Sequence, residues 1–352
     1  MLRSTNMGFY FFYLSAFIII TAGLKAASEI VIILLLSIIS ASILSPIMIY
    51  AKKLKIPKIL AYLFILFTVL SLFLAIFLIV ENSLKDFLTN LPGYEEKIKA
   101  LVIKIINFFD SYGLSIDPKA ILKELDISAL FKVTTKAVGN IGILLSKTVL
   151  VLIGTSFLLF ETPVFEKKLA IIFKNNKEAI ENFNLFSSSV KKYFIIKTST
   201  SFLTGVCITL MLYYFDVQYA ILWGFLGFLL NFIPVLGSLV AAIPAIILSL
   251  ITKDINSTLW IIFWYLVINN LISNVIEPKL MGQGFGLSPV IVFFSLIFWG
   301  WVLGAAGMFL AVVLTMTIKI AFDSNPKTRW IGILLSDLSK VKNIKFSQSL
   351  YR

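Results

Sequence analysis

Residues 220–250 read AILWGFLGFLLNFIPVLGSLVAAIPAIILSL, an apolar run broken near its middle by Asn231, Pro234, Gly237 and Pro244. As one straight helix this run would reach roughly 46 Å, whereas the hydrocarbon core of a bilayer is about 30 Å thick. The run is therefore too long for one direct crossing. It either tilts and bends strongly, or it folds back as a re-entrant hairpin whose irregular backbone is buried in protein or lines a cavity.

A second apolar run, residues 288–321, is also too long, at roughly 51 Å as a straight helix. Pro289 is its second residue, and it contains Gly300, Gly304 and Gly307. We favour a hairpin for both runs, because the spans at 200–217 and 258–276 would then each precede a hairpin. The two halves would form an inverted repeat of the kind found in transporters.

The composition places the whole chain in a membrane. Of its 352 residues, 59% are hydrophobic and 14% charged, and the mean hydropathy is +0.97. We therefore predict an all-α integral membrane protein with about eight hydrophobic segments, because continuous apolar runs span a bilayer as helices. The segments lie at 8–24, 29–50, 59–80, 141–162, 200–217, 220–250, 258–276 and 288–321.

Several classes of chemistry are excluded or disfavoured. The chain has no histidine and a single cysteine, Cys207, so triad catalysis and a disulfide framework are excluded, and no metal or cofactor is expected. It carries no phosphate-binding GxxxxGK[ST] sequence, so ATP hydrolysis is not expected. We interpret the net charge of +13 as a signal of membrane orientation rather than of nucleic-acid binding.

Lysine and arginine counts predict the topology. The link 51–58 carries four lysines, the segment 163–199 carries seven lysines against three glutamates, and the tail 323–352 is also basic. Positive charge concentrates on the cytoplasmic side, so these parts and both termini are predicted to be cytoplasmic in a bacterial inner membrane.

Two connecting segments are predicted to be amphipathic inserts. Residues 81–140 fall outside the cell in this topology, with a helix near 98–109 and another from Asp117, either on the membrane surface or against a neighbouring subunit. In the cytoplasmic insert, Phe183, Phe186, Val190 and Phe194 form an apolar stripe expected to face anionic lipid. The remaining divisions are N-terminal helices 1–80, a helix at 141–162 and a transport core at 200–322.

A polar stripe ends the apolar run before residue 278. Asn270, Ser273, Asn274 and Glu277 stand at i, i+3, i+4 and i+7, so a regular α-helix would place them on one face. A lone carboxylate there is typical of a transport path or an ion site. Alternatively, Glu277 pairs with Lys279 at the interface, and the neutral side chains join helices.

The break at 231–238 is the predicted partner of this stripe. Pro234 frees a backbone carbonyl one turn earlier, and the Asn231 amide and Ser238 hydroxyl lie close by. On the adjoining span, Ser201 and Thr204 add small hydroxyl groups. Such groups at a helix break bind ions or polar solutes in transporters.

Four stretches resemble a known family: YFIIKTSTSFLTGV, FDVQYAILWGFLGFLL, NFIPVLGSLVAAIPAI and VIEPKLMGQGFGLSPVIVFFSLIFWGWVLGAAGMFLAVVLT. Over residues 190–320 the sequence is similar to the autoinducer-2 exporter family, also called the permease M-like family. The resemblance implies a polytopic inner-membrane transporter associated with export of the quorum-sensing signal autoinducer-2, some members being described as sodium/proton antiporters. The matching motif positions are Asn231, Pro234, Gly237, Glu277, Pro278, Gly282, Pro289, Gly300, Gly304 and Gly307.

We therefore expect a secondary transporter, not an enzyme, that exports a small polar solute with a proton or sodium ion as the coupling ion. A sodium/proton antiporter that uses Glu277, or a membrane scaffold without transport activity, are the alternatives. The expected partners are the lipid bilayer, the solute, the coupling ion and further copies of the chain.

Overall fold

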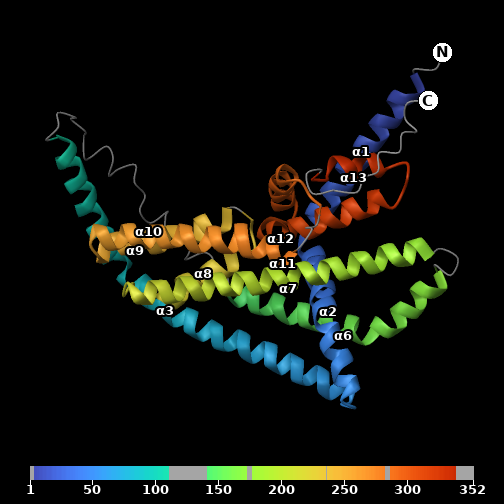
Figure 1. Ribbon diagram of the computed structural model, residues 1–352, viewed down its shortest axis with the longest axis horizontal. Coiled ribbons are helices and arrows are strands. Elements are labelled where there is room, and N and C mark those ends of the chain that lie inside the picture. Colours follow the sequence, from blue (N-terminus) through green and yellow to red (C-terminus); the bar gives the residue numbers. More distant parts are fainter. Residues whose placement is uncertain (1–3, 111–140, 173–176, 235, 282–285, 338–352) are drawn as a thin grey trace. The chain divides into compact units, whose positions relative to one another are not determined.

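The computed structural model describes residues 4–110, 141–172, 177–234, 236–281 and 286–337, and this part of the chain is helical apart from turns and one isolated bridge, Leu287 with Ser336. Figure 1 shows the helices. Their bounds are α1 Ser4–Ala26, α2 Ser28–Lys53, α3 Lys58–Asp110, α6 Ile141–Ile172, α7 Lys177–Tyr214, α8 Ala220–Leu230, α9 Leu236–Thr252, α10 Ile255–Asn270, the π-helix η1 Leu271–Ile276, α11 Glu277–Met281, α12 Pro289–Asp323 and α13 Arg329–Leu334.

Long apolar helices dominate, as the composition predicts. Within the described residues, five are long and apolar enough to cross a membrane, and three shorter apolar helices accompany them. The five are Ser28–Met48, Lys58–Ala100, Ser187–Tyr214, Ile255–Met281 and Pro289–Asp323, and the shorter ones are Phe11–Ala26, Ala220–Leu230 and Gly237–Thr252. The predicted all-α fold built from apolar helices is confirmed.

The chain forms two compact units. Unit 1 comprises Met1–Lys58, Val149–Ile196 and Leu280–Arg352, and unit 2 comprises Ile59–Thr148 and Lys197–Lys279. The long helix α7 passes from one unit into the other between residues 196 and 197. Each unit therefore draws its helices from distant parts of the sequence.

In unit 2, the apolar run 220–250 is interrupted between α8 and α9. The carbonyl of Leu230, which Pro234 deprives of a helix bond, instead accepts a hydrogen bond from the Ile233 N–H (2.8 Å). A side chain at Gly237 would collide with this same carbonyl, so only glycine permits the tight turn. Pro244, by contrast, lies inside the continuous helix α9. The break is therefore confined to the residues around Asn231–Pro234.

Helices α9 and α10 form an antiparallel pair. Near their connecting turn the hydroxyls of Ser249 and Thr258 are hydrogen bonded (3.0 Å), and at the far end Asn269 donates to Ser238. Asp254 caps the start of α10 by accepting a hydrogen bond from the Ser257 N–H (3.2 Å). Figure 1 shows α9 and α10 side by side. The two polar contacts fix the register of the pair.

In unit 1, α12 folds back on itself at Gly304, whose φ of 64° and ψ of −150° are not helical. The indole N–H of Trp299 donates to the hydroxyl of Thr315 (3.1 Å), although a straight helix would separate these positions by about 24 Å. Gly307 permits the close approach, because a side chain there would collide with the Trp299 carbonyl. Gly300 lies in the first leg of this hairpin, and Pro289 is the first residue of α12.

The core of unit 1 contains residues that the sequence assigned to a lipid-facing stripe. Val190 and Phe194 are buried with Ile39 of α2 and Leu310 and Met316 of α12. The prediction that these two side chains face anionic lipid is therefore wrong, because apolar side chains of other helices cover them. Phe183 is 36% exposed. The side chain of Phe186 is not among those that the structure describes.

The core of unit 2 includes the start of the predicted external insert. Helix α3 runs without interruption past residue 81, and its Val80, Leu84, Phe87 and Tyr94 are buried against α7, α8, α9 and α10. The predicted boundary between residues 80 and 81 thus falls inside one helix. The second helix predicted from residue 117 lies outside the described residues.

Candidate functional site

The polar sequence at the end of α10 adopts a π-helix. Residues Leu271–Ile276 form η1, and the N–H of Glu277 bonds to the Ile272 carbonyl, five residues earlier. A π-turn holds more residues than the α-turn, so the side chains after it are rotated relative to a continuous α-helix. Single π-turns inside α-helices are frequent at functional sites.

This rotation divides the predicted stripe into an inner and an outer group. On the outer side, Asn270 and Asn274 are exposed. The side-chain amide of Asn274 donates a hydrogen bond to the side-chain oxygen of Asn270 (2.9 Å). On the inner side Ser273 donates to Asn269 (3.3 Å), which in turn donates to Ser238 of α9 (2.7 Å). The four polar residues therefore do not share one face.

Glu277 forms an ion pair with the buried Lys197 of α7. The Lys197 Nζ lies 3.0 Å from Oε1 and 2.9 Å from Oε2 of the carboxylate, and the two side chains are 4% and 14% exposed. The Thr200 hydroxyl lies 3.3 Å from Oε2 and 3.2 Å from the Lys197 carbonyl. Lys279, the partner considered from the sequence, is exposed. The carboxylate is therefore held inside unit 2 by a cation from a different helix.

A polar face continues along α7 from this ion pair. Lys197, Thr200, Ser201 and Thr204 recur at helical spacing, and each is at most 3% exposed. The Asn231 side-chain amide, at the end of α8, donates to the Ser201 hydroxyl (3.0 Å), and the Thr204 hydroxyl donates to the Thr200 carbonyl (2.9 Å). The face thus leads from the ion pair to the break between α8 and α9.

The two polar sides of the break contact different helices. Asn231 before it bonds to α7, and Ser238 after it bonds to α10. Of the predicted site residues, the structure therefore brings Ser201 together with Asn231, and places Ser273 beside the Asn269–Ser238 contact. Pro278 follows Glu277 in α11, and Gly282 lies outside the described residues.

Lys197, Thr200 and Asn269 were not identified from the sequence. Lys197 was counted among the lysines of the cytoplasmic insert, although its spacing to Ser201 and Thr204 was a usable signal. Asn269 precedes the predicted stripe by one residue, and the packing of α10 against α9 places it beside Ser238.

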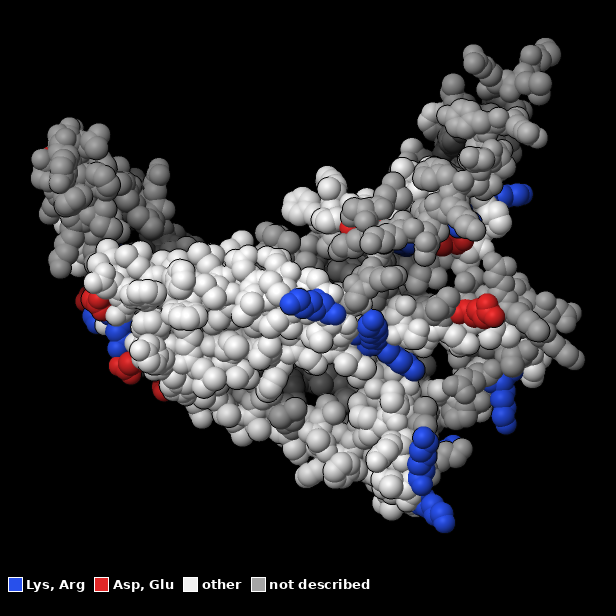
Figure 2. Space-filling model, viewed as in Figure 1, with Lys and Arg blue, Asp and Glu red and all other residues white. Residues whose placement is uncertain are grey.

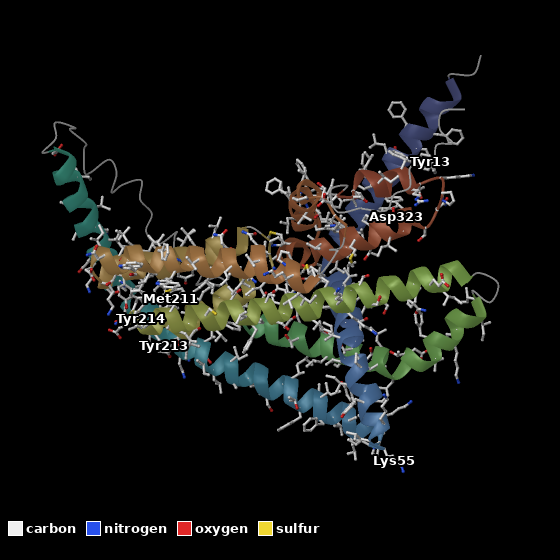
Figure 3. All side chains as sticks on the ribbon, viewed as in Figure 1. Tyr13, Lys55, Met211, Tyr213, Tyr214 and Asp323 are labelled. Atoms are coloured by element: carbon white, nitrogen blue, oxygen red, sulfur yellow. The ribbon has the colours of Figure 1, made fainter. Side chains whose placement is uncertain are left out.

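Charged and aromatic side chains mark the opposite end of unit 2. Tyr213 and Tyr214 lie exposed at the C-terminal end of α7 (Figure 3), as is typical of a membrane–water interface. Lys253 donates to Asp216 (2.7 Å), and this hydrogen bond lowers the pKa of the Asp216 carboxyl. On the face shown in Figure 2, charged atoms gather where α9 meets α10, and the surface of α10 beside them is uncharged.

The ion pair lies far from this interfacial end. Lys197 precedes Tyr214 by 17 positions on α7, which corresponds to roughly 26 Å along a helix. The apolar span Ser187–Tyr214 begins ten positions before Lys197, so the pair lies inside the part of α7 that is long and apolar enough to cross a membrane. Among the described residues, no group of three or more Cys, Asp or Glu side chains is placed to hold a metal ion.

Comparison with known proteins gives a consistent result. The profile of the AI-2E family transporter matches residues 14–327. The chain is 34% identical over 336 residues to a Haemophilus influenzae protein provisionally named a transport protein, with 94% of this chain and 96% of that protein covered. It is 32% identical over 327 residues to the AI-2 transport protein TqsA of Escherichia coli, with 93% and 95% covered.

Proposed function

The chain belongs to the AI-2E family of transporters, and on that premise we propose that it is a secondary transporter that exports a small polar solute of the autoinducer-2 kind. It is a multi-pass membrane protein of a transporter family, not of an enzyme family. In this proposal a proton or sodium ion drives export, and Glu277 is the coupling group.

The ion pair of the largely buried Glu277 carboxylate with Lys197 is the observation that carries the proposal. Helices α8, α9 and α10 of unit 2 contain no charged residue. Charged side chains that are largely removed from water are unfavourable unless they are paired, and intramembrane charges of this kind usually belong to a transport pathway. In this proposal Glu277 changes its partner or its protonation during transport.

The polar face of α7 supports a path that starts at the ion pair. Thr200, Ser201 and Thr204 offer hydroxyl groups in succession, and Asn231 extends them to the break between α8 and α9. We propose that the α8–α9 break and the α12 hairpin are re-entrant elements of an inverted repeat, because both runs are interrupted near their middle.

The proposed orientation places both termini in the cytoplasm, together with the part of residues 163–199 that precedes the apolar span Ser187–Tyr214. The turn between α2 and α3, where Lys55 lies (Figure 3), would be cytoplasmic by its lysines, and the Tyr213–Tyr214 end of α7 external. The ion pair would then lie near the cytoplasmic side of the membrane. We also propose that the protein forms a homo-oligomer in the bilayer.

Transport in proteoliposomes tests the coupling role of Glu277. A pH or sodium gradient is imposed, and export of autoinducer-2 and its exchange at equal concentrations are both measured. Glu277→Gln keeps the size of the side chain and removes its charge, so gradient-driven transport should be lost while exchange continues. Glu161→Gln is the matched control, because Glu161 pairs with Lys168 at an exposed position. Wild-type gradient-driven rates in Glu277→Gln would refute the assignment.

A sodium/proton antiporter is the second candidate, and the same ion pair favours it. A carboxylate beside a lysine can exchange its cationic partner without any organic solute. An internal pH change driven by a sodium gradient in solute-free liposomes would support this candidate, whereas dependence of the pH change on autoinducer-2 would support export.

A further inference from the structure

The hydroxyl of Tyr265 is an unpaired polar group in the core of unit 2. Tyr265 lies on α10 and is 5% exposed, and within the described part of the chain its hydroxyl has no hydrogen-bond partner. Buried polar groups are nearly always hydrogen bonded, because an unpaired one has lost its bonds to water without replacement. A phenylalanine would fill the same apolar space without that loss. The packing of the core therefore does not explain why position 265 carries a hydroxyl.

The register of α9 and α10 accounts for the missing partner. The hydrogen bond from Asn269 to Ser238 and the one near the connecting turn fit a single antiparallel register. Ala242 lies four positions, about one helical turn, after Ser238 on α9. Tyr265 lies four positions before Asn269 on α10, so the antiparallel pairing sets Ala242 opposite Tyr265. A methyl group neither donates nor accepts a hydrogen bond, so α9 offers the tyrosine hydroxyl no side-chain partner at this level.

Tyr265 also extends the inner row of polar side chains on α10. Tyr265, Asn269 and Ser273 follow one another at intervals of four positions, which places them on one side of the helix. Ser273 donates to Asn269, and Asn269 donates to Ser238. Of the three side chains in this row, only that of Tyr265 lacks a partner among the described residues. The row ends one turn before Glu277, the proposed coupling group.

The surroundings of Tyr265 are suited to an uncharged solute. Helices α8, α9 and α10 carry no charged side chain, and the buried cluster that contains Tyr265 is built from apolar and aromatic residues, among them Phe87 and Trp223. An ion at this level would be an unpaired buried charge. A phenol hydroxyl both donates and accepts, so it can pair with a hydroxyl or carbonyl group of a neutral molecule. Apolar walls with a few polar groups are typical of sites for small organic molecules.

We propose that the Tyr265 hydroxyl hydrogen bonds to the transported solute, an uncharged molecule with hydroxyl or carbonyl groups, as the solute passes along α10. In this structure the hydroxyl faces an alanine, and during transport the solute supplies the partner. The hydrogen bond forms only with solute bound, so it contributes to selection of the solute and not to the stability of the solute-free protein. This inference rests on the proposed export of a small polar solute and adds a residue that selects it.

The first test measures the stability of Tyr265→Phe. The purified full-length protein is unfolded in mixed micelles of increasing denaturing detergent, with and without autoinducer-2. Without solute, the variant should unfold at the same or a higher detergent fraction than the wild type, because it has lost an unpaired hydroxyl. Autoinducer-2 should raise the wild-type midpoint and raise that of the variant less, because a ligand stabilises a protein according to its affinity.

The control for this test is Tyr213→Phe, because Tyr213 is exposed at the end of α7, and it should behave as the wild type under both conditions. If Tyr265→Phe is less stable than the wild type without solute, the hydroxyl has its partner in the solute-free fold and the proposal is overturned. An equal shift by autoinducer-2 in Tyr265→Phe and in the wild type would also overturn it.

The second test measures exchange of autoinducer-2 in proteoliposomes over a range of concentrations. The concentration that gives half-maximal exchange should rise about two- to tenfold in Tyr265→Phe, as expected for the loss of one neutral hydrogen bond, and stay at the wild-type value in Tyr213→Phe. A wild-type value in Tyr265→Phe would overturn this inference and leave the proposed export intact. Absence of exchange in the wild-type protein would overturn the proposed export, and this inference with it.

Discussion

Two lysine–glutamate pairs in this protein have nearly the same geometry and opposite surroundings. Lys197 and Glu277 lie 2.9 Å apart with side chains 4% and 14% exposed, whereas Lys168 and Glu161 of α6 lie 2.7 Å apart with side chains 58% and 50% exposed. Distance alone would rank the exposed pair as the stronger. The comparison shows that burial, not separation, decides what loss of one partner does to the protein.

The physical reason is the solvation of the charge that is left behind. At the exposed pair, water solvates whichever charge remains, and such pairs contribute about 0–1 kcal/mol. At the buried pair, removal of one partner leaves a charge among apolar helices, which costs about 3–5 kcal/mol. The buried pair therefore has large effects when it is broken, even though the intact pair need not stabilise the fold.

The largest expected effect is that of Lys197→Met. It should lower the free energy of unfolding by about 3–5 kcal/mol, because Glu277 loses its partner, and Lys168→Met should lower it by at most about 1 kcal/mol. The double change Lys197→Met with Glu277→Leu should recover most of the loss but remain inactive in transport. Unfolding in mixed micelles of increasing denaturing detergent measures all three variants. A double variant no more stable than Lys197→Met would contradict the argument from burial.

The second effect tests the π-helix that orients Glu277. Deletion of the exposed Val275 should convert η1 into α-helix and rotate Glu277 by about 100° away from Lys197. We expect a loss of about 2–3 kcal/mol, less than for Lys197→Met, because the freed charges can still move toward water near the end of the span. Deletion of one residue after position 338 is the control, because it leaves the sequence of η1 and α11 unchanged. Normal gradient-driven transport in the Val275 deletion would show that the π-turn is dispensable.

A smaller effect compares two adjacent asparagines. Asn269→Ala removes the hydrogen bond to Ser238 and should destabilise the protein by about 0.5–1.5 kcal/mol. Asn270→Ala, on the exposed side of the same helix, should change stability by less than about 0.5 kcal/mol. The same unfolding measurement applies to both. Equal effects would indicate that the division into inner and outer groups has no energetic meaning.

The smallest effect is expected at Asp216. Its pKa is lowered in the folded protein by the hydrogen bond from Lys253, so its contribution to stability is present above the ordinary pKa of aspartate and disappears as the pH falls through the lowered value. Asp216→Asn should therefore cause only a small loss of thermal stability near neutral pH and none in strong acid. A large loss that persists in acid would show that Asp216 acts in another way.

The folded-back regions illustrate how far the sequence could be interpreted. The length of the run 220–250 and its breakers indicated an interruption, but they did not show that the turn lies at Asn231–Pro234 and that Pro244 continues a helix. Likewise, three glycines marked the run 288–321, and only Gly304 adopts a non-helical conformation. Whether the α8–α9 break and the α12 hairpin are re-entrant stays a prediction.

The sequence by itself determined the class of the protein: helical, membrane-spanning, without histidine chemistry, and similar to a transporter family. These properties follow from composition, segment length and local motifs, which do not depend on how the helices pack. The tertiary structure decided that Glu277 pairs with Lys197 and that Asn269 lies on the inner side. Lys197 is 80 positions from Glu277 in the sequence, and a single π-turn changes which side chains face inward. Helical periodicity predicts neither the Glu277–Lys197 pair nor the inner position of Asn269, because both depend on contacts between separate helices.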